Sequence, residues 1–366
     1  MRRSTRRVRL TLGAALAACV ATALPQGAAS AVGATSAAAV DGAGVERVSV
    51  APDGTQGDGD STGASITPDG RHVVFMSSAQ NLTATPGTAG NRAYLRDQTT
   101  TVTQRMGDYT PLSPPVVSGD GGYVAYPLTW VRNVRIRQYQ VATGFTASVN
   151  CLAYSCNQPS LTQDGRTAHV VYWNSPTQGQ SIEIQEWTVG AKQTVATFTH
   201  TAPSRPSISG DGLHVAYQNG LKEDVFVWDQ ASGTSSGPIE GQDPSILATL
   251  VQLSDDGTKV VYLSGSDTYV HDLASGTAQL VPDVRGVAID PTGRYLLYTP
   301  NDTSGPSLVL RDLTTGTDQT VSDQPAKAGV DSVSAGGRDV VFHSAADDLV
   351  PDDTNGKTDV FVRHFD

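Results

Sequence analysis

From residue 45 onward the chain consists of short apolar runs separated by glycine-containing turns. Seven segments share one pattern: a short run ending in Ser, Thr or Asp, a turn with Gly, and an apolar run closed by an aromatic residue. Asp-Gly between two β-rich runs predicts a hairpin, because Gly accepts the positive φ of a tight turn. The run after the turn is almost continuously apolar, which predicts a strand buried on both faces. The closing aromatic residues are Phe75, Tyr126, Tyr172, Tyr217, Tyr262, Tyr298 and Phe342.

A second turn signature follows the first in the same units. Asp229–Gly233, Asp272–Gly276 and Asp312–Gly316 read acid-x-x-hydroxyl-Gly, in which the carboxylate can accept backbone N–H groups across the turn. A β-rich run lies before each of these turns and a shorter one after it, so each unit supplies four strands. The closing aromatic residues lie 36 to 51 residues apart. Four-stranded units of about 40 to 50 residues are typical of propeller blades. The sequence therefore predicts an all-β fold, a seven-bladed β-propeller.

The two ends of this region complete the arrangement. The chain finishes with Asp359–Arg363, the third strand of the last unit, and Val45–Val50 is a lone β-rich run before the first glycine motif. We predict that Val45–Val50 forms the fourth strand of the last blade, which closes the ring and leaves no sheet edge exposed.

The paired motifs resemble a known repeat. Ser/Thr-x-Asp-Gly-x-x-Val-x-Phe/Tyr, as in Ile208–Tyr217, together with Asp-x-x-Ser/Thr-Gly is similar to the TolB-like, WD40-like propeller repeat of exported bacterial proteins. The resemblance covers residues 45–366 and implies the fold but no particular function. TolB has an α/β domain before its propeller and serves as a periplasmic docking platform. Here only residues 32–44 precede the first predicted strand, so the resemblance does not extend to that role.

The N-terminus predicts export. Five arginines precede residue 10, an apolar stretch follows to Leu24, and Ala29-x-Ala31 is a cleavage signature, so residues 1–31 read as a signal peptide. The alternative is lipidation at Cys19, because Leu16–Cys19 is similar to a lipobox. Residues 32–44 are predicted to be a flexible linker and residues 45–366 a single domain. The apolar stretch is shorter than the roughly 20 residues of a membrane span, so we expect none.

Charge and cysteine content narrow the partners. The net charge is −11, and removing residues 1–31 takes away five of the 25 basic residues and none of the 36 acids, which leaves −16. That balance disfavours nucleic acid and anionic membranes as partners. Cys151 and Cys156 are then the remaining cysteines, and in an oxidising compartment we expect them to form a disulfide. We expect a monomer outside the cytoplasm.

Local motifs for catalysis or metal binding are incomplete. Gly59–Gly63 matches G-x-S-x-G, but it lacks the strand-turn-helix context of a nucleophile elbow, so we interpret it as a loop. Residues 352–359 are similar to a Ca²⁺ loop with too few oxygen ligands, and we interpret them as an Asx-stabilised turn. His72, His169 and His214 share one repeat position and are assigned to strands. No catalytic residue, metal site or cofactor is predicted.

The most distinctive side chains belong to blades two and three. Trp130, Arg132, Tyr154 and Trp173 are predicted to share one rim of the propeller, with Arg135 and Arg137 nearby, and aromatic and Arg residues are enriched at binding hot spots. The alternative is that these aromatic residues pack at the seams between blades. We therefore expect a non-catalytic binding or scaffold propeller that docks a protein, peptide or glycan. The alternative function is a glycan hydrolase or lyase whose carboxylates converge at the central channel.

Overall fold

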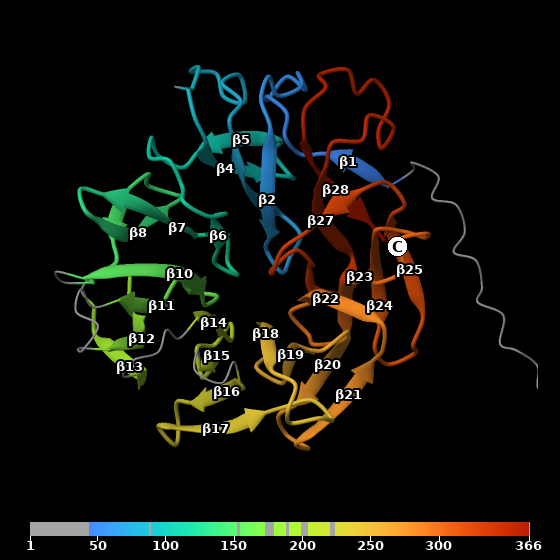
Figure 1. The fold of residues 1–366 in the computed structure, drawn as a ribbon. Helices are drawn as coiled ribbons and strands as arrows, with labels where there is room; N and C mark the ends of the chain where they lie inside the picture. The colour runs from blue at the N-terminus through green and yellow to red at the C-terminus, as the bar shows by residue number, and fades with distance from the viewer. Residues whose placement is uncertain are drawn as a thin grey trace, which may run out of the picture. The chain divides into compact units, whose positions relative to one another are not determined.

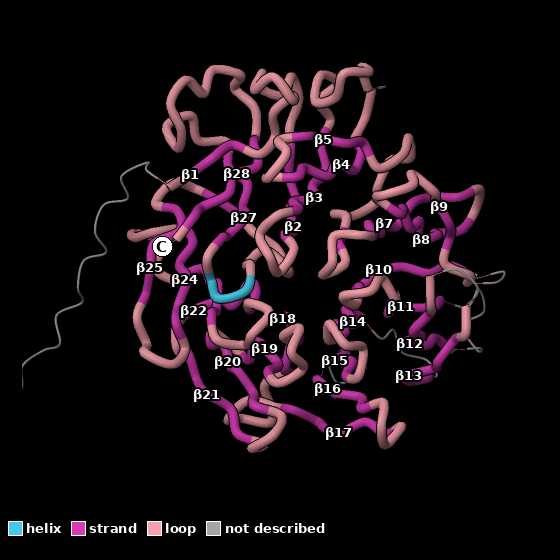
Figure 2. The backbone as a smooth tube through the Cα atoms, turned by 180° about the vertical axis from the view of Figure 1, so that it is seen from behind, coloured by secondary structure: helices cyan, strands magenta, loops and turns pink. Residues whose placement is uncertain are grey.

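Seven sheets surround a central axis, each antiparallel and four-stranded (Figure 1). The computed structural model describes residues 44–365 except 88, 152–153, 173–178, 188–189, 199–203 and 220–223. The predicted all-β, seven-bladed propeller is confirmed. In the described part of the chain the helical structure is one 3₁₀ turn, Ala335–Gly337, which Figure 2 shows beside the axis.

The blades follow the chain in order, and the first strand of each blade lies closest to the axis. Blade one is β2 (Ser61–Ile66), β3 (His72–Ser77), β4 (Arg92–Asp97) and β5 (Val102–Arg105); blade two is β6 (Val116–Val117), β7 (Tyr123–Trp130), β8 (Asn133–Gln140) and β9 (Thr146–Ser148); blade three is β10 (Ser155–Leu161), β11 (Thr167–Tyr172), β12 (Gln180–Gln185) and β13 (Lys192–Phe198). Blade four is β14 (Ser204–Ile208), β15 (His214–Asn219), β16 (Asp224–Asp229) and β17 (Thr234–Ile239); blade five is β18 (Ala248–Leu253), β19 (Lys259–Ser264), β20 (Asp267–Asp272) and β21 (Thr277–Val281); blade six is β22 (Val284–Ile289), β23 (Tyr295–Pro300), β24 (Leu308–Asp312) and β25 (Asp318–Ser322). Blade seven is β26 (Ala326–Lys327), β27 (Asp339–Ser344), β28 (Asp359–His364) and β1 (Val45–Arg47).

The ring closes through the N-terminal strand, as predicted. β1 pairs antiparallel with β28, with Val45 opposite Arg363 and Arg47 opposite Phe361. Regular pairing covers Val45–Arg47 rather than the whole predicted run to Val50. The next residue still contributes, because the Val48 N–H donates to the Val360 carbonyl at 2.8 Å.

The core lies between neighbouring blades. The closing aromatic residues Phe75, Tyr126, Tyr262 and Phe342 are fully buried, in apolar clusters that join one sheet to the next. Buried tyrosine hydroxyls are satisfied: Tyr126 Oη donates to the Met106 carbonyl at 2.6 Å. This burial on both faces explains why the second strands of the blades are almost continuously apolar.

The Asp-Gly turns link the blades into a ring at one end of the axis. In blade two, Ser118 Oγ donates to Asp120 Oδ1 at 2.6 Å, and Asp120 Oδ1 accepts the Gly122 N–H at 2.8 Å. The turns also bond to each other, since the Gln163 N–H donates to the Gly210 carbonyl and the Gly210 N–H to the Asp255 carbonyl, both at 2.8 Å. Each motif therefore shapes its own hairpin and also contacts the next blade.

Two faces of the propeller can now be distinguished. The turns between first and second strands and between third and fourth strands lie on one face, which we call the turn face. The connections between second and third strands and from one blade to the next lie on the other, which we call the loop face. No helix in the described residues is long and apolar enough to cross a membrane. The predicted signal peptide and lipidation site lie outside the described residues.

Candidate functional site

The structure places the predicted rim residues in different environments. Trp130 is the last residue of β7 and Arg132 lies in the two-residue turn to β8, so both are exposed on the loop face. Tyr154 is half-buried beside the disulfide loop. Trp173 lies outside the described residues.

Trp130 belongs to a cluster that includes two further side chains. The Tyr109 and Trp130 rings meet edge to face with centroids 5.7 Å apart, and the Arg137 guanidinium lies 4.8 Å from the Tyr109 ring and 5.9 Å from the Trp130 ring. Arg137 Nη1 donates to Ser148 Oγ at 3.1 Å. Such cation–π contacts hold a planar guanidinium in one orientation. Tyr109 was not anticipated from sequence, because the loop from β5 to β6 that carries it has no motif.

The cluster begins in a seam and emerges at the surface. Alternate side chains of a strand share a face, so Trp130 lies on the face of β7 that also carries Tyr126 and Leu128, which pack against blade one. Yet Trp130 is 47% exposed and Tyr109 is 37% exposed. Packing in the seam between blades one and two therefore covers only part of each ring.

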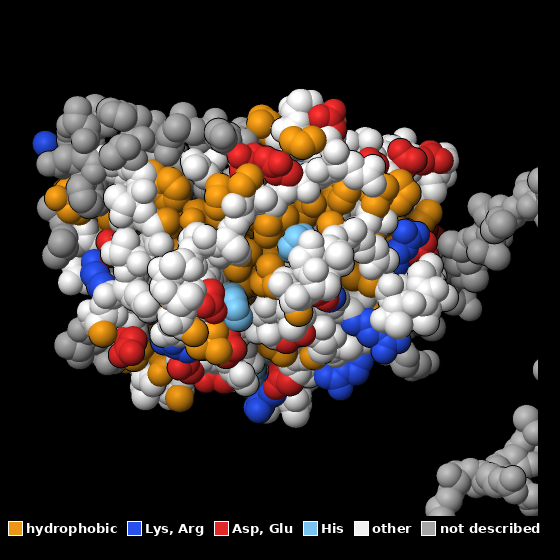
Figure 3. Space-filling model, turned by 90° about the horizontal axis from the view of Figure 1, so that it is seen from below, with side chains coloured by type: hydrophobic (Ala, Val, Ile, Leu, Met, Phe, Trp, Pro, Cys, Tyr) orange, Lys and Arg blue, Asp and Glu red, His pale blue; other side chains and the backbone are white. Residues whose placement is uncertain are grey.

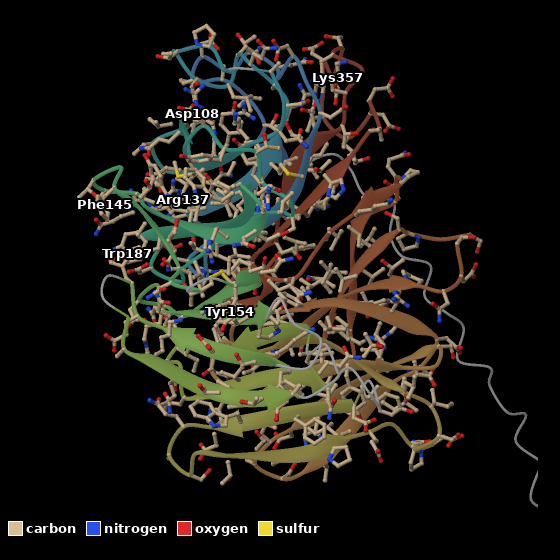
Figure 4. All side chains as sticks on the ribbon, turned by 60° about the vertical axis from the view of Figure 1, so that its left-hand side comes forward. Asp108, Arg137, Phe145, Tyr154, Trp187 and Lys357 are labelled. Atoms are coloured by element: carbon tan, nitrogen blue, oxygen red, sulfur yellow. A yellow bond between two sulfur atoms is a disulfide. The ribbon has the colours of Figure 1, made fainter. Side chains whose placement is uncertain are left out.

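Tyr154 serves the seam between blades two and three. It packs beside Cys151 and Cys156, which form the predicted disulfide with Cα atoms 5.9 Å apart. The Tyr154 carbonyl accepts a hydrogen bond from Arg135 Nη1, and Ser155 Oγ accepts the Val134 N–H at 3.1 Å. The disulfide loop thus supports β8, which carries the arginines. Figure 4 shows Arg137 and Tyr154 on neighbouring blades, with Lys357 on a different group of loops.

Exposed apolar side chains favour the loop face. Among the described residues, six of the eleven large exposed hydrophobic residues lie in or at the ends of its connections, and three lie in or at the ends of the turns on the turn face. The six are Tyr109, Leu112, Trp130, Val131, Ile246 and Leu247. On the outer edge over β17 and β21, Figure 3 shows hydrophobic side chains among uncharged polar ones, and exposed Leu280 belongs to β21.

The central channel opens on the loop face as a cavity of about 440 Å³. Its wall is mainly apolar, and it carries one guanidinium, that of exposed Arg285, and one carboxyl, that of Asp331. Toward the turn face the channel narrows to a small pocket of about 30 Å³ that Asp255 and Asp331 both line. The channel therefore narrows from an apolar mouth to an acidic end.

Asp331 is held by the protein itself. Gln252 Nε2 donates to Asp331 Oδ1 at 2.8 Å, while Gln252 Oε1 accepts the Asp331 N–H at 3.2 Å and the Ile289 N–H at 3.3 Å. One buried amide thus joins blades five, six and seven. Burial raises the pKa of Asp331 to about 6.

Asp255 is the second channel carboxyl. It occupies the variable position of the blade-five turn, Ser254-Asp255-Asp256-Gly257, where the other blades have Pro, Gly, Gln or Ala. Burial, with a smaller contribution from the charge of Asp331, raises the pKa of Asp255 to about 7. Neither carboxyl was predicted from the sequence, although Asp255 is marked as an acid at a repeat position that is uncharged in the other blades.

The weak local motifs have structural explanations. Ser61 of the G-x-S-x-G match is not in a loop, as we had interpreted it; it begins β2, is fully buried, and donates to Ser77 Oγ at 2.8 Å. In the segment similar to a Ca²⁺ loop, Arg47 provides the positive charge: its Nη2 lies 2.8 Å from Asp353 Oδ2 and its Nε 3.6 Å from Asp359 Oδ2. His72, His169 and His214 lie in strands, as assigned. Within the described residues, no three His, Cys, Asp or Glu side chains gather as metal ligands.

Comparison with known proteins defines the fold alone. No family model matches the chain, and no curated protein matches it in sequence. Among solved structures, an oligogalacturonate lyase in complex with manganese superposes with a TM-score of 0.64 and 14% identity, covering 88% of this chain and 93% of the lyase. The β-propeller domain of Cps50 (Swd1) from Myceliophteria thermophila has a TM-score of 0.50 and 11% identity, covering 84% and 97%. TolB from Acinetobacter baumannii has a TM-score of 0.44 and 16% identity, covering 81% and 80%.

The chain therefore has a propeller fold that an enzyme and other propeller proteins share. Because the identities to the lyase and to the Cps50 domain are 14% and 11%, their likeness to this chain is limited to the arrangement of the blades. Fold does not determine function in such widely used architectures. Function in such a fold depends on the residues of the site.

Proposed function

We propose that this protein is a non-catalytic, extracytoplasmic binding propeller that docks a protein, peptide or glycan on its loop face. The observation that carries this proposal is the exposed Tyr109–Trp130–Arg137 cluster, with Arg132 at the adjacent hairpin tip. Trp, Tyr and Arg are the residues most enriched at binding hot spots. Export is proposed from the N-terminal sequence, and the Cys151–Cys156 disulfide is consistent with an oxidising compartment.

The cluster suits docking because its parts are already in place. Two rings fix Arg137, and the disulfide loop bonds to the strand that carries it. Less side-chain freedom is then lost on binding, which improves affinity without new contacts. Trp173, predicted for the same rim, lies outside the described residues and is included in the proposed site on sequence grounds.

The test compares the wild-type protein with two variants as bait against the exterior proteins and glycans of the producing cell. We expect a partner that the wild type and Phe145→Ala retain and Trp130→Ala/Arg132→Ala loses. Phe145 is the matched control, because it is an exposed aromatic residue on the turn face. A partner retained equally by all three proteins would contradict docking at this cluster.

A second candidate function is a glycan hydrolase or lyase acting in the channel. The observation that favours it is the pair of channel carboxyls, Asp255 and Asp331, whose raised pKa values would suit proton transfer near neutral pH. The solved oligogalacturonate lyase makes uronate oligomers the first substrate to try.

Turnover of oligogalacturonate, followed by the ultraviolet absorbance of an unsaturated product or by reducing ends, separates the two functions. A channel enzyme requires activity in the wild type and its loss in Asp331→Asn, with Trp130→Ala unaffected. The binding function requires that neither the wild type nor the variants turn over the substrate. Activity that survives Asp331→Asn would contradict the assignment of the channel carboxyls.

A further inference from the structure

The segment that runs from the end of blade one to β12 of blade three carries few acids compared with the rest of the chain. Residues 98–182 contain three of the 36 acids, Asp108, Asp120 and Asp164, against five arginines. Asp120 and Asp164 lie in Asp-Gly turns, on the turn face. Asp108 is the acid that remains on the loop side, and Arg105 pairs with it at 3.2 Å.

Three further arginines of this segment lie near the aromatic cluster in sequence, and Arg137 is the one that contacts its rings. Arg132, Arg135 and Arg137 lie on or beside β8, with Arg132 exposed at the hairpin tip next to Trp130. Against a whole-chain net charge of −11, this surface is a local basic site on an acidic molecule. A basic patch attracts carboxylates and disfavours cationic partners.

The same surface also carries exposed aliphatic side chains. Beside the rings lie two exposed aliphatic side chains, Val131 at 86% and Leu112 at 52% exposure. Sugar rings stack on aromatic faces, whereas aliphatic side chains gain most from covering by other aliphatic side chains. The patch therefore suits a polypeptide better than a glycan.

We propose that Tyr109, Leu112, Trp130, Val131, Arg132 and Arg137, here called the blade-two patch, bind a peptide segment of a partner protein in which acidic residues alternate with large apolar ones. This inference rests on the proposed docking function and assigns the partner's chemical class. Arg132 and Arg137 take carboxylates, for which the guanidinium fork is suited geometrically. An apolar side chain of the peptide covers Trp130 and Val131.

Selection from a phage-displayed library of random dodecapeptides tests the proposal on the full-length secreted protein. Parallel selections use the wild type, Trp130→Ala, Arg132→Glu, and the controls Phe145→Ala and Lys357→Glu. Lys357 is an exposed cation on the same face in a different group of loops (Figure 4). We expect wild-type selection to enrich peptides with Asp or Glu beside Leu, Ile, Phe or Trp. Their affinity should fall at least tenfold in Trp130→Ala and in Arg132→Glu and stay within twofold in both controls.

Each other outcome overturns a defined part of the proposal. Neutral or basic peptides that still depend on Trp130 would overturn the acidic class and leave docking at the patch intact. Peptides whose binding ignores Trp130 and Arg132 alike, or no enrichment over background, would overturn the patch as a peptide site. Binding of polygalacturonate that Arg132→Glu abolishes, in the absence of selected peptides, would replace the peptide by an anionic glycan. Trp130→Ala and Arg132→Glu change exposed side chains, so we expect their melting temperatures to match that of the wild type. Matching melting temperatures would show that a loss of binding does not come from unfolding.

Discussion

At the scale of single residues, the channel shows how one repeat position can change the electrostatics of a whole axis. The variable residue of the Asp-Gly turn is uncharged in six of the seven blades, and in blade five it is Asp255. Its carboxyl lies where the channel is narrowest, near Asp331. Two carboxyls in a poorly solvated space disfavour each other's ionisation, so Asp255 opposes folding at neutral pH.

The Asp255→Asn substitution is therefore expected to stabilise the protein, and more at high pH than at low pH. The folded pKa of about 7 lies above the unfolded value of 3.8, so the wild type loses stability as pH rises through this interval. At pH 8 the variant should gain about 2–4 kcal/mol in unfolding free energy, and near pH 4 the difference should vanish.

Urea unfolding at both pH values measures this effect. Asp347→Asn, on an exposed loop, is the control that should change little at either pH. Equal destabilisation by Asp255→Asn at both pH values would show that the carboxylate has a structural partner instead.

At the scale of elements, the glycine of each Asp-Gly turn has two separate structural roles. Each adopts a positive φ, and each also packs against a side chain of the preceding blade. Gly337, with φ of 67°, shows both: a Cβ there would lie 2.7 Å from Cγ of Tyr295 in blade six. Gly276, in the second type of turn, has φ of 68° and open space around it. The two turn signatures thus differ in packing rather than in backbone shape.

Alanine substitutions at Gly276 and Gly337 separate the effect of the positive φ from the effect of close packing. Gly276→Ala should lower the unfolding free energy by the backbone cost alone, about 1–2 kcal/mol. Gly337→Ala should add an overpacking cost of about 1–3 kcal/mol, because Cγ of Tyr295 cannot move away from the new methyl group. Chemical unfolding of both variants measures the difference. Equal costs would mean that the blade seams tolerate an extra methyl group, and that the first turn is conserved in the repeats for its φ alone.

The closing strand contributes a cation as well as backbone bonds. Arg47 of β1 neutralises Asp353 and Asp359, and all three side chains are almost fully buried. Arg47→Ala leaves two carboxylates buried beside each other and should cost about 3–5 kcal/mol of unfolding free energy.

Calorimetry with and without calcium checks this prediction. Calcium should not raise the melting temperature of the wild type, because the guanidinium already occupies the position of a cation. An Arg47→Ala protein as stable as the wild type would indicate that the two acids are protonated or hydrated in the fold.

What the sequence could predict follows from how local each feature is. Hairpin turns, strand burial and the closing strand are set by residues close together in the chain, so the repeats predicted blades, blade number and closure. The Tyr109–Trp130–Arg137 cluster joins residues from two blades, and only Trp130 and Arg137 stood out. The channel pair Asp255 and Asp331 converges from blades five and seven, and no local spacing announces such a meeting.

At the scale of the whole molecule, the ring depends on joining the two ends of the domain. β1 covers the edge of β28, and the loop that follows β1 bonds to both neighbouring loops: Asn355 Nδ2 donates to the Gly57 carbonyl at 3.1 Å, and Asn81 Nδ2 donates to the Gln56 carbonyl at 2.8 Å. The strand and the loop therefore close the same seam from two positions. The docking that we propose on the loop face should depend on this closure, because the patch lies where blades one and two meet within the ring.

Deleting the closing strand tests that dependence. A chain that begins at Val48 loses β1 and Arg47 but keeps the loop bonds, whereas a chain that begins at Gly44 keeps all of them. We expect the shorter chain to melt roughly 5–10 °C lower and to self-associate through the unpaired edge of β28. A synthetic peptide of residues 44–47, the part that the shorter chain lacks, should bind that edge and reverse both effects, as measured by calorimetry and size-exclusion chromatography. Equal melting temperatures and a monomeric short chain would show that the loop contacts alone hold the ring, and that the strand is dispensable for the face on which we place binding.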